Sequence, residues 1–308
     1  MPLVLISSPR FADHMTPVGH PERPERGEVL TRVAESYRAG GGDVIEPRPA
    51  TDADLLRVHT QAHVDAIVAT CGKATMIDED TFTSPDSEEV ARLAAGAVCV
   101  GVDRALDGPA GSRALVLVRP PGHHAEADRA MGFCLYSNIA VGAAYARSRG
   151  CGRVAIVDYD VHHGNGTQWI FYEDPTVLFV SSHQFPFYPG TGAPDETGRG
   201  AGVGFTLNVP LTIGTKDAEI ERLYAAQVVP ALRAFKPDLL MISAGFDAHE
   251  QDPLGQLRLT TAGFGRLTRM LLDVADEVCA GRAVIVTEGG YDLDAIEDCL
   301  GEVIRVAS

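Results

Sequence analysis

The stretch VAIVDYDVHHGNG, residues 154–166, decides how the rest of the chain is interpreted. It begins as an apolar run that suits a buried β-strand, and it then places Asp158, Asp160, His162 and His163 within six positions. Burying an unpaired carboxylate costs several kcal/mol, so a cluster of this kind needs a compensating cation. A metal ion is the obvious candidate for that cation.

Other strand-like and helix-like patterns surround this stretch. Apolar runs predict strands at 3–7, 114–118, 154–158, 177–181, 205–209, 239–243 and 283–288. Helical periodicity covers 52–71, 87–106, 217–235 and 260–279, the last with Thr260 or Thr261 as its N-cap. Strands that are apolar throughout and alternate with helices predict an α/β fold whose parallel sheet is covered on both faces. No linker or repeat divides the chain, so we expect one domain, 1–308.

Composition narrows the classes of function. The chain has 308 residues, 45% of them hydrophobic, and a formal net charge of −16, which argues against nucleic-acid binding because phosphate is neutralised by Lys and Arg. That charge suits a cationic substrate, and it equally suits a soluble surface. Six cysteines without close pairs, an N-terminus typical of a first strand and the absence of a long apolar run indicate a reduced, cytoplasmic protein without a membrane helix. A homo-oligomer is left open.

Reactive side chains follow four of the predicted strands. His123 and His124 come after 114–118, Asp160 and His162 after 154–158, Asp247 after 239–243, and Tyr291 after 283–288. Ligands of open parallel sheets bind beyond the carboxyl ends of the strands. The sequence therefore predicts one active site at that edge of the sheet.

Alternation within the opening stretch selects the metal ligands. Asp158, Asp160 and His162 share one face of an extended chain, whereas His163 points to the other face and is interpreted as a core histidine. Asp160 and His162 form a good ligand pair, and Asp247 is a natural third ligand. Such a set leaves coordination positions for water and substrate, as catalytic sites do. It suits Zn²⁺, while Fe²⁺, Co²⁺ and Mn²⁺ stay open.

The remaining histidines divide into two groups. Pro-Pro-Gly before His123 and His124 fixes a turn, and two adjacent imidazoles repel each other when both are protonated, so this pair is interpreted as functional. A structural or surface role is expected for His59, His63, His183 and His249.

Several segments together resemble the zinc-dependent histone deacetylase family, which also contains acetylpolyamine amidohydrolases. The resemblance runs from about residue 10 to residue 300, with details of the class II branch, and is carried by GHPERPER (19–26), RPPGHHAEADRAMGFC (119–134), DYDVHHGNGTQWIFY (158–172), YPGTG (188–192), SAGFDAHEQDPLG (243–255) and EGGYDL (288–293). It implies the arginase/deacetylase fold, a three-layer αβα domain around a mostly parallel eight-stranded sheet.

The resemblance also assigns roles to residues. It implies Zn²⁺ ligation by Asp160, His162 and Asp247, and a structural K⁺ site that includes Asp158 and Ser181. The catalytic residues it implies are His123 paired with Asp158, His124 as general base and acid with Asn165 as its partner, and Tyr291 as donor to the oxyanion. Asn165 stands where the class I branch has aspartate, which should leave the pKa of His124 lower than an aspartate would.

The resemblance suggests a substrate class as well. It implies a narrow channel lined by Gly132, Phe133 and Tyr188, which suits the aliphatic stem of an acyl-lysine. Leu254, seven residues after Asp247, stands where the polyamine-specific class II enzyme carries a glutamate. We therefore expect deacylation of acyl-lysine in proteins or peptides, with an acetylpolyamine or other small N-acetyl amine as the alternative. A non-catalytic acyl-lysine binder and a binuclear manganese ureohydrolase are rival interpretations.

Overall fold

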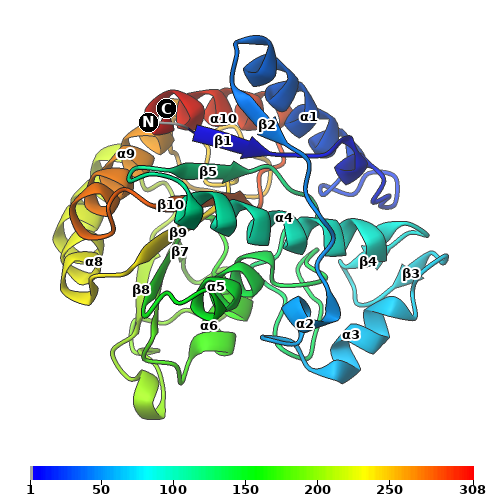
Figure 1. Ribbon diagram of the computed structural model, residues 1–308, viewed down its shortest axis with the longest axis horizontal. Coiled ribbons are helices and arrows are strands. Elements are labelled where there is room, and N and C mark those ends of the chain that lie inside the picture. The colour runs from blue at the N-terminus through cyan, green and yellow to red at the C-terminus, as the bar shows by residue number, and fades with distance from the viewer. Residues whose placement is uncertain (1–2) are drawn as a thin grey trace.

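A parallel sheet of eight strands forms the centre of the computed structural model, which describes residues 3–308 (Figure 1). The strand order is β2-β1-β5-β10-β9-β6-β7-β8, and every neighbouring pair is parallel. This confirms the α/β prediction. The strands are β1 (Leu3–Ile6), β2 (Asp43–Ile45), β5 (Arg113–Val116), β6 (Val154–Asp158), β7 (Val177–Gln184), β8 (Thr206–Leu211), β9 (Leu239–Ala244) and β10 (Ala283–Thr287). A small antiparallel hairpin consists of β3 (Thr75–Met76) and β4 (Phe82–Thr83).

Helices cover both faces of the sheet. The helices are α1 (Pro24–Ala39), α2 (Asp52–Leu55), α3 (Gln61–Val68), α4 (Ser87–Asp107), α5 (Asn138–Ser148), α6 (Asn165–Phe171), α7 (Asp217–Leu223), α8 (Val229–Phe235), α9 (Thr261–Val278) and α10 (Leu293–Ala307). Short 3₁₀ turns, η1 (Pro9–Ala12) and η2 (Gly200–Gly202), and a π-helical segment, η3 (Tyr224–Val228), complete the chain.

Alternating strand side chains divide the core into two clusters. Leu115 and Ile285 pack in the cluster that includes residues of α1, α9 and α10, while Val116 and Val284 pack in the cluster that includes residues of α4 and α5. A strand that is buried on both faces has no polar side, which is why these segments are apolar at every position. The two clusters are the two interfaces of the three-layer arrangement.

Two features differ from the expectation. The eighth strand, β2, is a three-residue edge strand without a fully buried side chain, so it leaves no apolar run in the sequence. The helix expected over 52–71 is broken into α2 and α3, because the Thr51 and Thr60 hydroxyls each cap a separate helix start. At the start of α9, by contrast, Thr260 is the N-cap as predicted, with its hydroxyl accepting from the Gly263 N–H at 3.1 Å.

The state of the cysteines and the character of the helices complete the description of the fold. Five of the six cysteines are buried, Cys71 is exposed, and all six are free thiols. None of the helices within residues 3–308 has both the length and the apolar character required to cross a bilayer.

The strand order explains how the site forms. β5, β10, β9 and β6 are consecutive neighbours in the sheet, and these are the four strands that the predicted reactive residues follow. Their parallel direction brings the loops after them to one edge.

Candidate active site

Three side chains from two neighbouring strand ends form a candidate metal centre. Asp160 and His162 follow β6, and Asp247 follows β9, which pairs with β6. All three are buried, and one donor atom of each lies within 4.8 Å of the other two. His162 Nδ1 lies 3.2 Å from Asp160 Oδ1 and 3.1 Å from Asp247 Oδ2. The structure thus brings together the three residues that the sequence selected as ligands.

Backbone amides hold both carboxylates in place. Asp160 Oδ1 accepts from the His162 N–H and Asp160 Oδ2 from the Gly289 N–H, each at 2.9 Å. Asp247 Oδ1 accepts from the Val161 N–H at 2.8 Å. Glycine at position 289 allows this close approach, because a Cβ there would collide with Asp247 Oδ2 and lie 2.6 Å from Asp160 Oδ2.

The cluster has the electrostatic character of a cation site. Burial and the nearby Asp160 carboxylate raise the pKa of Asp247 to about 7. Burial disfavours a charged His162, but its hydrogen bonds to Asp160 and Asp247 outweigh burial and raise the pKa of His162 to about 10. Two ionised carboxylates buried this close together are stable only beside a positive charge, which a divalent cation supplies. Two carboxylates and one imidazole are a donor set that fits Zn²⁺.

The tandem histidines lie beside this centre, each with its own partner. His123 Nδ1 lies 2.9 Å from Asp158 Oδ2, and His124 Nδ1 lies 2.7 Å from Asn165 Oδ1. The Asn165 amide nitrogen donates to Glu126 Oε1, so its oxygen is the acceptor for a His124 Nδ1–H. Neutral His124 therefore keeps the lone pair on Nε2.

The two imidazoles differ in protonation. Burial opposes a charge on His123, but the Asp160 and Asp158 carboxylates outweigh it and raise the pKa of His123 well above its usual value. Burial, together with the charges of His123 and His162, lowers the pKa of His124 well below its usual value. With ring centroids only 4.0 Å apart, one cationic and one neutral ring is the stable combination. His124 is thus the member of the pair that can accept a proton.

Tyr291 lines the same narrow cavity of about 80 Å³ as His124 and His162. Burial and the nearby Asp247 carboxylate raise the pKa of the Tyr291 hydroxyl well above its usual value, so it stays a donor. The centroid of the Tyr291 ring lies 5.1 Å from the guanidinium carbon of Arg26. The backbone N–H of Tyr291 donates to Asp252 Oδ2 at 2.7 Å.

The predicted channel residues line this cavity too. They are Gly132, Phe133, Tyr188 and Leu254. Phe133 has a φ of 68°. Its ring packs edge-on against the Tyr291 ring, with 5.8 Å between the two ring centroids. Tyr188 contacts the His124 ring edge-on at 5.2 Å. Gly132 allows the close approach, because a Cβ there would lie 2.5 Å from the His124 ring.

Asp80 is a cavity residue that the sequence did not reveal. Its carboxylate accepts from the Thr81 hydroxyl at 2.8 Å, and burial together with nearby Asp78 raises its pKa. It lies in the β3–β4 hairpin, which no motif marked, so only the tertiary fold brings it to the cavity.

The residues predicted for potassium lie on neighbouring strands. Asp158 on β6 is in register with Ser181 on β7. The Ser181 hydroxyl lies 2.9 Å from His183 Nδ1, and the Ser182 hydroxyl donates to the Asp158 carbonyl at 3.4 Å. Potassium binding stays a prediction.

His163 is buried away from the ligands, as the alternation argument required. Its Nδ1 lies 2.7 Å from the Thr191 hydroxyl and its Nε2 lies 3.0 Å from Gln168 Oε1. These contacts anchor the loop that carries Tyr188, so His163 supports the channel without entering it.

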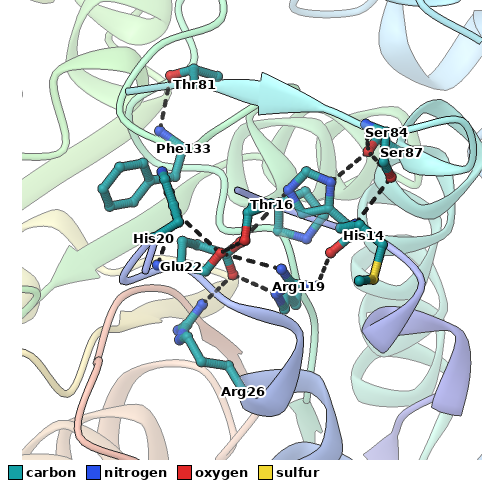
Figure 2. A network of polar contacts seen from close by, with 12 residues as sticks. His14, Thr16, His20, Glu22, Arg26, Thr81, Ser84, Ser87, Arg119 and Phe133 are labelled. Atoms are coloured by element: carbon teal, nitrogen blue, oxygen red, sulfur yellow. Dashed lines mark hydrogen bonds and ion pairs between the residues drawn. The ribbon is translucent and has the colours of Figure 1, made fainter. Parts of the chain in front are cut away.

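Figure 2 shows a network of polar contacts centred on Glu22, a residue without solvent exposure. Glu22 Oε1 accepts from Arg26 at 2.7 Å and from Arg119 at 2.6 Å. Burial would raise the pKa of Glu22, but the two guanidinium groups lower it below its usual value. Arg26 also donates to the carbonyls of Glu288 and Gly290 at 2.6 Å each, which ties this network to the Tyr291 loop. The GHPERPER motif contains Glu22 and Arg26, but nothing in it revealed their partners.

A second part of the network in Figure 2 supports the channel wall. His20 Nε2 lies 3.0 Å from the Asp80 carbonyl, and its ring contacts Phe133 edge-on at 4.8 Å. The Thr81 hydroxyl accepts from the Phe133 N–H at 3.1 Å. Two loops that are distant in sequence therefore hold Phe133 in its left-handed conformation.

Comparison with known proteins agrees with this geometry. The histone deacetylase domain model matches residues 20–307. Histone deacetylase 15 of Arabidopsis thaliana is 42% identical over 297 residues, covering 93% of this chain and 52% of that protein, so the chain spans about half its length. The histone deacetylase-like amidohydrolase of Pseudomonas aeruginosa is 40% identical over 296 residues, with 94% and 77% of the two chains covered.

An archaeal protein and a solved structure extend the comparison. The probable deacetylase of Archaeoglobus fulgidus is 39% identical over 280 residues, covering 89% of this chain and 78% of that protein. The crystal structure of the HDA15 HD domain has a TM-score of 0.92 at 39% identity, with 99% of this chain and 89% of that chain covered.

Proposed function

The chain belongs to the histone deacetylase family, and we propose that it hydrolyses the amide of Nε-acetyl-lysine in proteins or peptides to lysine and acetate. The observation that carries this proposal is that His162, a neutral histidine and a protonated tyrosine line one narrow cavity, with two buried carboxylates in contact with His162. Acyl transfer to water needs this combination: an electrophilic centre, a base and an oxyanion donor.

The metal fits the residues that would hold it. Asp160, His162 and Asp247 would bind Zn²⁺, the metal typical of the family, which when bound supplies Lewis acidity toward a carbonyl oxygen and toward water. The chain's own contribution is to keep both carboxylates oriented through backbone N–H donors.

His124 is the proton carrier in this proposal. Its Nδ1–H is occupied by Asn165, so Nε2 accepts the proton of the attacking water and then returns it to the departing amine nitrogen. Its lowered pKa keeps it unprotonated at neutral pH, and the same low pKa makes it a ready acid toward the amine after it has taken the proton.

His123 and Tyr291 each stabilise negative charge in this proposal. His123, held by Asp158, stays cationic and offsets negative charge near the ligands. The Tyr291 hydroxyl donates to the oxygen of the acyl carbonyl as it becomes an oxyanion, and one well-placed donor of this kind contributes on the order of 3–4 kcal/mol.

The cavity walls support an acyl-lysine as the substrate. The aromatic rings of Phe133 and Tyr188 suit the apolar stem of a lysine side chain. Leu254 offers no charge for a second ammonium group. Asp80 adds an acceptor for an N–H group of the substrate close to the acylated side chain.

One observation favours a second candidate, an acetylpolyamine. Asp78 lies close enough to Asp80 to raise the pKa of Asp80, so a second carboxylate stands beside the one that lines the cavity. A polyamine ammonium would pair with them as readily as a peptide N–H would. The chain's net charge of −16 points the same way.

A substrate panel tests the proposal. We expect the zinc-loaded protein to show a higher kcat/KM for an acetyl-lysine peptide than for acetylputrescine or acetylspermidine, with release of the free amine as the readout. A preference for the polyamines would overturn the lysine assignment and leave the amidohydrolase assignment standing. Failure to cleave any of the three would overturn both.

Metal analysis separates the rival interpretations. Within residues 3–308 one cluster of His, Asp, Glu and Cys side chains has donors close enough to share an ion, so we expect one catalytic ion per chain. Two ions per chain would favour a ureohydrolase. Tight acetyl-lysine binding without turnover would favour a binding protein, and turnover that survives a chelator would remove the metal from the proposal.

A further inference from the structure

A buried carboxylate that the mechanism does not use lies directly behind the tandem histidines. Glu288 follows β10 and has no solvent exposure. Its Oε2 accepts from the backbone N–H groups of Gly122 at 2.7 Å and His123 at 3.1 Å, and its Oε1 accepts from the Ser243 hydroxyl at 3.0 Å. The carboxylate forms no salt bridge with any Lys or Arg of residues 3–308.

The tandem-histidine turn depends on this carboxylate for its backbone. Pro120 and Pro121 have no N–H, so Gly122 and His123 carry the first two backbone donors after Arg119. Both N–H groups donate to the Glu288 carboxylate. Thr287 extends the same connection, because its hydroxyl accepts from the Val118 N–H and donates to the Val118 carbonyl, each at 2.8 Å.

His123 is thereby held at both ends. Its backbone N–H donates to Glu288, and its ring pairs with Asp158 at 2.9 Å. Its ring centroid lies 4.0 Å from that of His124, so a displaced His123 would displace the proton carrier as well. On the other side of Glu288, the Gly289 N–H donates to Asp160, and Tyr291 follows two residues later.

We infer that Glu288 is a positioning residue that fixes the tandem-histidine turn relative to the Tyr291 loop. It does so by accepting hydrogen bonds rather than by its charge. Glutamine is then an adequate replacement. Its amide oxygen accepts from Gly122 and His123, and its amide nitrogen donates to the Ser243 hydroxyl, which can turn to accept. Aspartate keeps the charge but is one methylene too short to reach the same donors.

This inference rests on the proposed function for one of its readouts only. The test compares Glu288→Gln, Glu288→Asp and Glu288→Ala in the zinc-loaded full chain, by amide hydrogen exchange over residues 119–126 and by kcat and KM on an acetyl-lysine peptide. We expect parent-like protection and kcat within about threefold for Glu288→Gln. We expect fast exchange and a loss of about hundredfold in kcat for Glu288→Asp and Glu288→Ala, with KM nearly unchanged, because a small misplacement of catalytic groups costs about that much.

The order of the variants decides the question. An aspartate variant that equals or exceeds the glutamine variant would overturn the inference, as would a glutamine variant that does not fold or a Glu288→Ala variant with parent-like exchange. Glu302→Gln, the same change at a carboxylate paired with Arg305 on the surface of α10, is the matched control and should change neither readout. If the parent cleaves no amide, the proposed function fails while the exchange data still test Glu288.

Discussion

The hydroxyl of Tyr291 is the single group whose removal should separate catalysis from folding. Its ring is packed against Arg26, and none of the described residues forms a hydrogen bond with the hydroxyl, so phenylalanine keeps the packing. We expect Tyr291→Phe to retain metal content and melting temperature while kcat falls by about 10²–10³-fold, the usual effect of deleting one oxyanion donor. Steady-state kinetics with metal analysis would check this, and near-normal turnover would contradict the assignment.

Asp80 should act on substrate binding rather than on chemistry. It lines the cavity, while Glu79 beside it is exposed and does not. Because a hydrogen bond to a charged acceptor contributes about 1.5–3 kcal/mol, we expect Asp80→Asn to raise KM for an acetyl-lysine peptide by about tenfold or more with little change in kcat. An acetylated monoamine, which has neither the neighbouring N–H nor a second ammonium group, should show the same KM with the parent and with Asp80→Asn.

Glu79→Gln is the matched control for Asp80→Asn. It removes one negative charge from the same hairpin without touching the cavity. An equal increase of KM in both variants would mean that long-range charge, and not a contact with Asp80, governs binding.

At the level of elements, strands with mostly buried side chains were predictable, the edge strand β8 among them, and the exposed edge strand β2 was not. Seven of the eight strands are visible as apolar runs because most of their side chains are buried. β2 has one neighbour and half-exposed side chains, so it leaves no such run. The break between α2 and α3 arises because the Thr60 side chain caps the start of α3. The apolar periodicity of the sequence continues across this point, so it does not reveal the break.

The site follows the same division. Asp160, His162 and Asp247 were predictable because strand alternation and the carboxyl ends of parallel strands place them by local rules. Asp80 and Glu288 were not, because their roles arise from contacts with segments that are distant in sequence. Local patterns therefore give the reactive groups, and the tertiary fold gives the groups that orient them.

Gly289 gives an element-scale prediction for the loop after β10. A Cβ at this position would collide with Asp247 and crowd Asp160, so we expect Gly289→Ala to lose metal binding and turnover. Zinc titration by calorimetry would measure the loss. Retention of the parent's zinc affinity would show that the loop can move away from both carboxylates.

Gly301 on α10 is the matched control for this substitution. A Cβ there meets no atom within 4 Å, and the residue is exposed in mid-helix. We expect Gly301→Ala to keep zinc affinity and to raise the free energy of unfolding by about 0.5–1 kcal/mol, because alanine is the better helix former.

Buried histidines couple the stability of the whole molecule to pH. Burial lowers the pKa of His59 to about 3 and those of His14 and His183 to about 4. The contacts of His59 require a neutral ring, since Nδ1–H donates to the Glu126 carbonyl and Nε2 accepts from the Ser137 N–H. The folded protein therefore resists protonation at sites that the unfolded chain protonates readily.

The sign of the resulting pH dependence follows from this difference. As pH falls below about 6.5, the unfolded chain binds protons at these histidines and the folded protein does not, so the free energy of unfolding falls by about 1.4 kcal/mol per pH unit for each group. Glu288, whose pKa burial raises to about 7, works in the opposite direction, because the folded protein binds that proton first. Among these four groups the balance is a net loss of stability toward acid, and His163, whose pKa burial lowers to about 3, adds to that loss.

We therefore expect urea denaturation of the zinc-loaded protein to give a lower free energy of unfolding at pH 5 than at pH 7. His59→Gln removes one of the titrating groups, so its stability should fall less steeply over the same interval, by about one proton in the slope, even though the variant is less stable at pH 7. Keeping zinc and ionic strength equal in both series removes the effect of metal release from the comparison. Equal slopes in parent and variant would contradict the prediction, because the folded protein would then protonate His59 despite the contact between its Nε2 and the Ser137 N–H.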